Sequence, residues 1–340
     1  MASKIMDAMS AASRGCSRPS VVSDEHTLPS LPRAVLGGGH QLTRKAREDI
    51  ITLSGARPLR FLTVLVTNWL AIAALIALGV YADSWVVTGV CIVLIGWRQL
   101  VLGLLLHDQV HRLGLRGKYG DWIVNCLAAY PILVTTVEDY AKVHLMHHKY
   151  FFTERDPDHI RKSGAEWAFP MPLRRFMGII ARDLTGINTV RVIRGKTAPK
   201  NADEFTRRNP TPVWLRVIFW VMCISAISVF GGWYLFLVYW ILPLLTTFQL
   251  ALRWIAVTEH IYNAENALCL DVTPLIELRW WQKLIFPDLN FALHAYHHEH
   301  PGVPFGNLPK VHEIYKREGL VNEAAVFHGQ GAYLKFLIAR

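Results

Sequence analysis

Long apolar runs dominate the pattern of this chain, and they occur in two closely spaced pairs. The first pair covers about residues 61–80 and 85–106, and Arg98 is the single charged residue within either run. The second pair covers about residues 214–230 and 232–252 and is interrupted at Gly231-Gly232. Each run approaches the roughly 20 apolar residues that a helix needs to cross a bilayer. The pattern predicts an all-α integral membrane fold with four transmembrane helices in two hairpins.

Two further segments have weaker patterns. Residues 121–137 are apolar but short for a crossing, so we expect a helix at or just inside the membrane interface. In residues 171–185 apolar side chains recur at helical spacing, with Arg174, Arg175 and Arg182 outside the stripe. This stripe predicts an amphipathic helix that lies on the membrane surface or packs within a cytoplasmic helical cap.

The distribution of basic residues predicts the orientation. Lys and Arg gather before the first run and between the two pairs, whereas the turns at residues 81–84 and 231–232 contain neither. Since basic flanks stay in the cytoplasm, we expect both hairpins to enter the membrane from that side. Both termini and the histidine clusters described below would then be cytoplasmic. A true crossing by residues 121–137 would place the first and second clusters on opposite sides.

Composition agrees with a multi-pass membrane protein. Hydrophobic residues make up 52% of the chain, and the mean hydropathy is positive. The formal charge of +10 follows from the basic membrane flanks and their attraction to anionic lipid heads. These basic residues do not line one face, so no nucleic-acid partner is expected. The five cysteines lack CxxC spacing, which favours small buried side chains over disulfides or a zinc site.

Both ends of the chain lie outside the predicted membrane domain. Residues 1–40 contain no apolar core of the kind that signal peptides have. We expect residues 1–45 to form a mobile cytoplasmic tail. The membrane domain is predicted over residues 46–315, and residues 316–340 would form a C-terminal cytoplasmic segment.

Three histidine clusters stand beside the apolar runs. They are His107-Asp-Gln-Val-His111, His144-Leu-Met-His147-His148 and His294-Ala-Tyr-His297-His298, and His260 follows the fourth run. Residues three or four apart on a helix share a face, whereas adjacent residues diverge by about 100°. The repeated spacing therefore predicts one site for two neighbouring metal ions, with these nine histidines as candidate ligands. His300 is expected to point elsewhere, because Pro301 ends the helix there.

The number of histidines bears on the metal. Imidazole binds zinc, iron, copper and nickel, but eight or nine histidines exceed the needs of a tetrahedral zinc site. Two six-coordinate irons fit the number better. A pH sensor or proton relay is the alternative, but it requires neither the repeated spacing nor the position beside apolar runs. Carboxylates that could orient the imidazoles are Asp108, Glu138, Asp139, Asp156, Asp158 and Glu259.

In these motifs and in their order, the chain resembles the membrane fatty acid desaturase superfamily over about residues 60–315. The resemblance includes the three clusters, Asp156-Pro157-Asp158, Glu259-His260 and the stretch from Asn290 to His312. It implies that the nine histidines bind two Fe ions, with Asn290 in the surrounding shell. O2 would be the co-substrate for oxidation of an unactivated C–H bond in a lipid. One departure is Arg112 after the first cluster, where many relatives have glycine.

The resemblance favours fatty acyl desaturation and leaves alternatives. Hydroxylation of an alkane, fatty acid or carotenoid-like substrate is one, because Glu259-His260-Ile-Tyr262 has a counterpart in alkane hydroxylases. A metal transporter without catalysis would need ionisable groups along its spans, where the chain places Arg98 near the end of one. An oxidation by O2 also needs external electrons. The chain has no flavin fingerprint or rubredoxin-type CxxC pair, so a separate ferredoxin, rubredoxin or cytochrome b5 with its reductase is implied.

Overall fold

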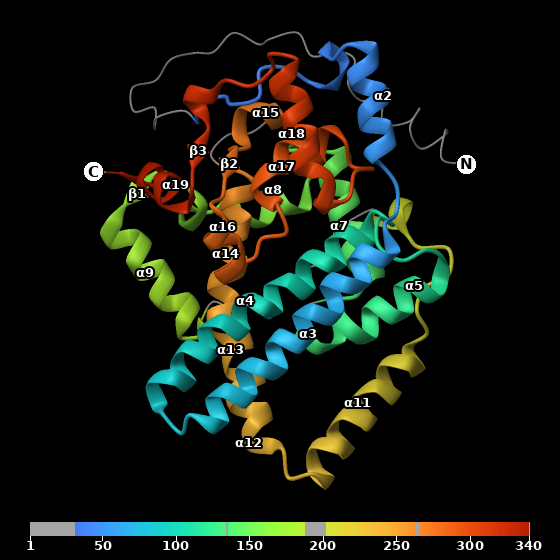
Figure 1. Ribbon diagram of the computed structural model, residues 1–340, viewed down its shortest axis with the longest axis vertical. Helices are drawn as coiled ribbons and strands as arrows, with labels where there is room; N and C mark the ends of the chain where they lie inside the picture. Colours follow the sequence, from blue (N-terminus) through green and yellow to red (C-terminus); the bar gives the residue numbers. More distant parts are fainter. Residues whose placement is uncertain (1–30, 134, 188–201, 263–265, 340) are drawn as a thin grey trace.

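The computed structural model describes residues 31–133, 135–187, 202–262 and 266–339 (Figure 1). This part of the chain is mostly helical. Its strands are two residues long and form parallel pairs, β1 (Met171–Pro172) with β4 (Ile338–Ala339) and β2 (Ile276–Glu277) with β3 (Phe327–His328). The predicted helical fold is therefore confirmed.

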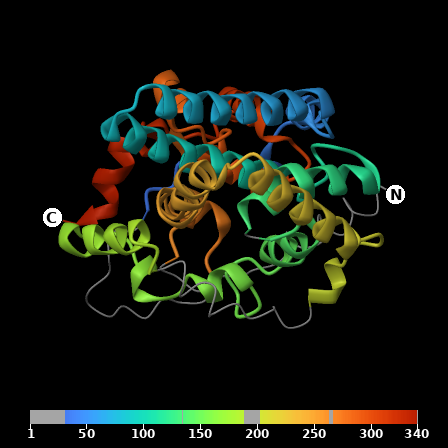
Figure 2. The same ribbon diagram turned by 90° about the horizontal axis from the view of Figure 1, so that it is seen from below.

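Among the residues that the structure describes, three helices are long and apolar enough to cross a membrane. Two of them, α3 (Pro58–Tyr81) and α4 (Trp85–Val110), form a hairpin and lie side by side in Figure 2. The third covers Trp233–Glu259 and consists of α12 (Trp233–Phe236), π-helical η5 (Leu237–Ile241), α13 (Leu242–Leu245) and α14 (Thr247–Glu259). They correspond to the predicted runs at 61–80, 85–106 and 232–252. Both α4 and α14 continue past the apolar runs, which carries His107 and His260 to the ends of long helices.

The remaining apolar segments are less regular. The predicted run at 214–230 forms α11 (Val213–Val229), a helix of 17 residues. Residues 121–137 do not form one helix, because α5 (Gly117–Val124), π-helical η2 (Asn125–Ala129) and α6 (Tyr130–Ile132) end at Leu133, which has φ 59°. The next helix, α7 (Val137–Lys149), is bent by 87° from this group. Either a broken span or a re-entrant segment has this form, so the two-hairpin topology and its orientation stay predictions.

Most of the remaining elements gather at one end of the molecule, the upper part of Figure 1, while the helix of residues 173–184 runs down the left side. They include α2 (Arg44–Leu53), α8 (Pro157–Arg161), α9 (Leu173–Leu184), α15 (Cys269–Val272), α16 (Trp280–Ile285), α17 (His294–Glu299), α18 (Leu308–Arg317) and α19 (Gln330–Leu337). Short 3-10 turns join them: η1 (Gly39–Gln41), η3 (Ala165–Trp167), η4 (Ala202–Phe205), η6 (Phe291–Leu293), η7 (Phe305–Asn307) and η8 (Glu323–Ala325). We call this group of helices the cap. The amphipathic stripe at 171–185 is confirmed as a helix, α9.

Both ends of the described chain pack into the cap. Val35 forms an antiparallel bridge with Val321, and the Leu36 amide donates to the Leu320 carbonyl at 2.9 Å. Ala34, Val35 and Leu42 are buried with the cap core. Residues 31–45, at the end of the predicted tail, are thus held against the C-terminal segment.

Close packing between α4 and α14 fixes the helices that lead to the histidines. A Cβ atom at Gly96 would lie 2.1 Å from Thr247 Oγ1 and 2.8 Å from the Phe248 amide nitrogen. Because no side chain fits there, the two backbones can approach closely. Buried side chains such as Leu105 and Ile255 continue the contact toward the cap. The ends of α4 and α14 are therefore set by a shared apolar core.

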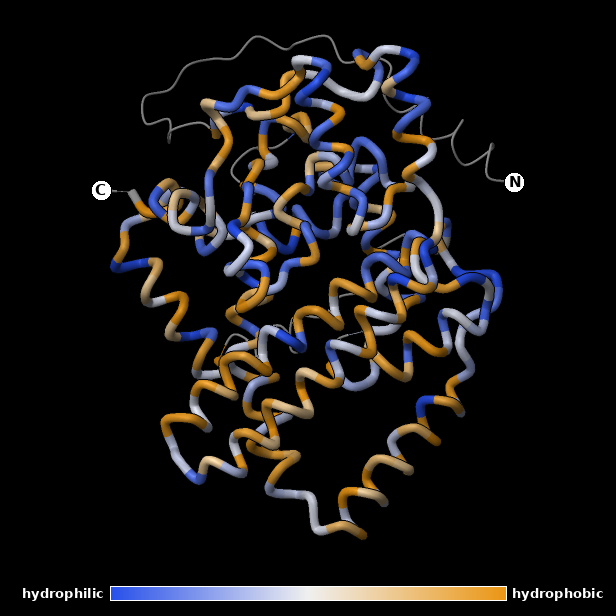
Figure 3. Tube along the Cα trace, in the orientation of Figure 1, coloured by the Kyte–Doolittle hydropathy of each residue, from blue (hydrophilic) through white to orange (hydrophobic). Residues whose placement is uncertain are grey.

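Apolar side chains also cover the outer surface of the long helices. Those on α3 include Leu70, which is 63% exposed, and those on α11 include Val221, which is 58% exposed. Figure 3 shows this lower region as mostly hydrophobic, whereas polar residues are frequent in the cap. Since apolar surface of this extent is unfavourable in water, it indicates a multi-pass membrane protein.

Candidate metal centre

The first cluster lies at the C-terminal end of α4. His107 is in the last turn and His111 is the C-cap residue. The chain then turns through Arg112 at φ 60°, with Leu113 N–H donating to the Asp108 carbonyl and Arg112 N–H to that of Gln109. These two bonds form the Schellman motif, in which the left-handed position favours glycine. The geometry accounts for the glycine that many relatives have at the position of Arg112.

The second cluster lies at the C-terminal end of α7. Thr136 caps the start of this helix by accepting a hydrogen bond from the Asp139 amide at 3.1 Å. Acidic residues occupy the first turn, while His147 and His148 stand in the last turn. The acidic residues at the start and Lys149 at the end suit the helix dipole.

The third cluster is on the short helix α17. Asp288 stabilises the turn before this helix by accepting hydrogen bonds from the amides of Asn290 and Ala292, both at 3.0 Å. The helix ends at Glu299, before Pro301. His300 then turns away and shares a hydrogen bond with Tyr315 Oη at 2.9 Å, as Pro301 led us to expect.

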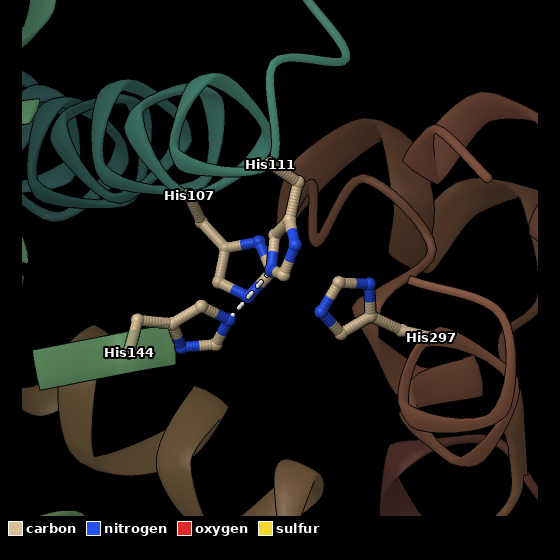
Figure 4. A group of neighbouring side chains, drawn as sticks. All are labelled: His107, His111, His144 and His297. Atoms are coloured by element: carbon tan, nitrogen blue, oxygen red, sulfur yellow. Dashed lines mark hydrogen bonds between the residues drawn. The ribbon is translucent and has the colours of Figure 1, made fainter. Parts of the chain in front are cut away.

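Four histidines from three helices converge in a first group. Nitrogen atoms of His107, His111, His144 and His297 all lie within 4.8 Å of one another. Figure 4 shows the four rings pointing toward a common centre, with the two from the end of α4 facing those of α7 and α17. His144 Nε2 lies 2.8 Å from His111 Nε2. We call these residues group 1.

Three more histidines form a second group beside the first. They are His147, His260 and His298, whose nitrogens meet the same 4.8 Å limit. His260 Nε2 lies 3.3 Å from His147 Nε2 and 3.1 Å from His298 Nε2. We call them group 2. The vicinal pair His297-His298 divides between the two groups, as its angular separation on a helix requires.

The two remaining candidates lie next to both groups. His148 Nε2 is 2.9 Å from His144 Nε2 and 3.0 Å from His297 Nε2, and its ring stacks on that of His298. The ring of His294 lies 4.9 Å from that of His260 and 5.2 Å from that of His297, measured between centroids. The structure thus brings all nine histidines of the sequence prediction together.

The ring nitrogens fit a cation at their centre. Two facing Nε2 atoms can share only one proton, so several lone pairs point into the same buried volume. Within the part of the chain that the structure describes, His107 Nδ1 and Nε2 and His294 Nδ1 are buried without hydrogen-bond partners. Such atoms are costly unless something binds them. A metal ion bound through one nitrogen of each ring would remove part of that cost.

Burial keeps the histidines neutral. It lowers the pKa values of His260, His297 and His298 well below the ordinary value, and neighbouring histidines lower them further. Burial together with the nearby Arg207 lowers the pKa of His111 to about 3. Since neutral imidazole is the form that binds metal, these candidate ligands could bind an ion at physiological pH without losing a proton.

Two polar side chains orient histidines of group 2. His147 Nδ1 lies 2.9 Å from Asp156 Oδ2, and His260 Nδ1 lies 2.8 Å from Thr273 Oγ1. Each contact leaves the Nε2 atom directed at the group. Asp156 was among the predicted carboxylates. Thr273 was not, because it is distant from His260 in sequence and belongs to no recognisable motif.

The predicted side chains of Asp108, Asp158 and Asn290 form hydrogen bonds or ion pairs with groups other than the histidines. Asp108 accepts a hydrogen bond from the Phe305 backbone, and Asn290 Nδ2 donates to the Phe305 carbonyl at 3.3 Å. Asp158 pairs with Arg161 and with Lys162, the latter at 3.2 Å. Glu259 lies beside these charges at the end of α14. Asp108 and Asn290 therefore join the histidine-bearing elements to η7, and they orient α4 and α17 rather than an imidazole.

Comparison with known proteins agrees with this arrangement. A model of the fatty acid desaturase family matches residues 83–329, which include all nine histidines. The chain belongs to the fatty acid desaturase family. It is therefore an oxidoreductase, and the resemblance found in the histidine clusters is confirmed. The enzyme is also 24% identical over 306 residues to dihydrorhizobitoxine desaturase from Bradyrhizobium elkanii, a match that covers 85% of this chain and 86% of that protein.

Proposed function

We propose that this desaturase uses two iron ions and O2 to oxidise an unactivated C–H bond of a lipid, most directly by placing a double bond in a fatty acyl chain. The observation that carries the proposal is the meeting of two histidine groups at the ends of helices α4, α7, α14 and α17. Family membership supports the reaction type, and the exposed apolar helices support a lipid substrate.

The proposed ligands divide as the groups do. Group 1 would hold one ion and group 2 the other, with His148 and His294 placed to complete the two sets. When bound, an iron pair supplies the activation of O2 that oxidation of such a C–H bond requires. Imidazole ligands suit iron, and nine of them exceed a tetrahedral site.

The protein contributes orientation and the exclusion of water. The Asp156 carboxylate accepts from His147 Nδ1 and so selects its tautomer, and Thr273 holds the ring orientation of His260 through a hydrogen bond at Nδ1. His107, His294 and His297 are buried, so water has little access to the centre. A dry site of fixed ligands favours reaction with a bound substrate over loss of oxidant to solvent.

A small, mainly apolar cavity lies near the C-terminal ends of α4 and α14. Its walls include Trp97, Leu100 and Phe286, and it reaches Thr258 and Ala292, each two residues before a proposed ligand. The cavity has a volume of about 10 Å³, enough for about one water molecule and not for an acyl chain.

A fatty acyl chain is the substrate that we propose. The relative from Bradyrhizobium elkanii is named for action on dihydrorhizobitoxine, so the comparison does not single out a fatty acyl chain. A separate electron donor is also proposed, for which a ferredoxin, a rubredoxin or cytochrome b5 with its reductase would serve.

Lipid analysis of cells that express the protein tests the function. Mass spectrometry should show a lipid that has lost a pair of hydrogens, and ¹⁸O2 should leave no label in it. The His144→Ala variant should form none of this product, while His300→Ala should retain it, since His300 bonds to Tyr315 outside both groups. Incorporation of ¹⁸O would identify a hydroxylase instead. Absence of any oxidised product with an active donor system present would reject the proposal.

A further inference from the structure

The segment Glu204–Thr211 crosses both helices that carry the first two histidine clusters. It begins within η4 and contacts α7 at each end and the end of α4 in the middle. We call it the strap. Neither its position nor its contacts follow from the histidine motifs.

The strap is fastened to both ends of α7. Near the C-terminal end, Glu204 pairs with Lys149, the residue after His148. At the N-terminal end, Glu138 Oε1 accepts hydrogen bonds from the amide of Thr211 at 2.8 Å and from its hydroxyl at 2.5 Å. Asn125 completes this junction by donating to Glu138 Oε2 at 2.9 Å and to Thr211 Oγ1 at 2.7 Å.

The two attachments restrict the path of the strap. Glu138 and Lys149 are about 17 Å apart along a helix that rises 1.5 Å per residue. Because the strap is attached near both ends of α7, its middle lies beside this helix and the end of α4, where it contacts Val110.

Arg207 stands at this middle and meets the end of α4. Its Nη2 donates to the carbonyls of Val110 at 2.6 Å and Gln109 at 3.3 Å. These carbonyls belong to the last turn, where a helix lacks internal donors and carries partial negative charge. Arg207 is 9% exposed, and Asp121 lies 3.8 Å from its Nε as counter-charge.

The Gln109 side chain makes further buried hydrogen bonds that stabilise the last turn of α4. The Gln109 side chain donates to the Leu115 carbonyl at 2.9 Å and to Asp121 Oδ1 at 2.7 Å, and it accepts from the Leu115 amide at 2.8 Å. Gln109 lies between His107 and His111 in sequence. Asp121 therefore joins the cluster residue Gln109 to Arg207.

We propose that Arg207 is a positioning residue for the metal centre. Through the strap it holds the last turn of α4, and so His107 and His111, at a fixed distance from His144 on α7. The side chain donates hydrogen bonds to backbone carbonyls and forms an ion pair with Asp121, so it acts through the helix end and not on a substrate. This inference rests on the proposed metal centre.

The test uses the full-length protein in detergent and the variant Arg207→Met. Arg208→Met is the matched control, because Arg208 is the adjacent arginine and is exposed. The variant should fold with unchanged helix content yet lose iron to a chelator about tenfold faster or more, as expected when an outer support of a metal site is removed. Its cobalt-loaded form should have a shifted absorption spectrum, which reports ligand geometry. Arg208→Met should match the wild type in both measurements.

Two further variants test the same role of Arg207 with smaller changes to the protein. Arg207→Lys should be intermediate, since an ammonium lacks the planar fork of the guanidinium. Thr211→Val removes the hydroxyl that joins the strap to Glu138 at the N-terminal end of α7. This variant should shift the cobalt spectrum in the same direction as Arg207→Met. If Arg207→Met is folded and equals the wild type in iron loss and cobalt spectrum, the inference is wrong. If it does not fold, wild-type behaviour of both Arg207→Lys and Thr211→Val overturns it. A wild-type protein that binds no iron would instead reject the proposed function.

Discussion

Arg112 follows the C-terminal end of α4 and adopts an unfavourable backbone conformation there. Its φ of 60° is in the left-handed region, which costs an L-residue about 1–2 kcal/mol. Arg112→Gly should therefore raise the thermal unfolding midpoint, by the equivalent of about 1 kcal/mol, with activity retained. The Arg112→Ala variant is the control, because it removes the charge and keeps the Cβ atom. An equal gain in both variants would show that charge and not backbone conformation sets the effect.

Asp156 tests the orientation of a single imidazole. Its Oδ2 faces His147 Nδ1, while its Oδ1 accepts from the amides of Asp158 and His159 at the start of α8. Asp156→Asn can keep the hydrogen bonds that Oδ1 accepts from the amides of Asp158 and His159. It loses the bond that Oδ2 accepts from His147, since an amide NH2 cannot accept. Iron affinity should fall about 10- to 100-fold with the fold retained, as measured by competition with a chelator.

The exposed Asp139, on the same helix as His147, provides the control for that experiment. Asp139→Asn should leave iron affinity unchanged. Unchanged affinity in Asp156→Asn as well would show that Asp156 serves the fold of α8 and not the histidine.

At the scale of elements, Glu277 on β2 joins this strand to α18 and β3. Its carboxylate accepts from His312 Nε2 at 2.9 Å and Lys316 Nζ at 2.6 Å on α18, and it pairs with His328 on β3. Tyr296 on α17 shares a hydrogen bond with the other ring nitrogen of His312 at 2.7 Å. The network thus connects the strand β2 with the helix that carries the third cluster.

This network predicts an acid-sensitive contribution to stability. Burial alone would raise the pKa of Glu277, but the hydrogen bonds from Lys316 and His312 outweigh it and lower the pKa to about 2. A lowered carboxyl pKa stabilises the fold above the ordinary carboxyl value, and this stabilisation is lost as the pH falls toward 2. Glu277→Gln should therefore lower the unfolding midpoint at pH 6, with a difference from the wild type that shrinks as the pH falls below 4 and is small near pH 2. Glu323→Gln, at a more exposed partner of Lys316, should have a small effect at both values. A constant difference across this range would contradict the assignment.

The elements differ in how far the sequence determines them. Apolar runs are local signals, so α3 and α4 could be predicted closely. Residues 121–137 could not, because the helix ends where Leu133 takes a left-handed conformation after Pro131, and composition does not show that bend. In the site, helical periodicity predicts that His297 and His298 face different groups. Thr273 and Arg207 depend on contacts between distant segments, and such partners have no pattern that a single sequence displays.

At the scale of the whole molecule, the arrangement in the membrane is the main untested prediction. The positions of Lys and Arg place both termini and the histidines in the cytoplasm. Cysteines introduced at Asp83 and Gly232 should react with an impermeant reagent in intact cells, whereas one at Lys149 should react only after permeabilisation. Reaction at Lys149 from outside would mean that the bent segment α5–α7 crosses the membrane.

The central claim is that the two histidine groups hold a pair of iron ions. Metal analysis of the purified, active, full-length enzyme tests it most directly. Two irons per chain are expected, falling together with activity in His147→Ala and His297→Ala, one variant from each group. Full activity in a preparation that contains a single zinc, or no iron, would contradict the account.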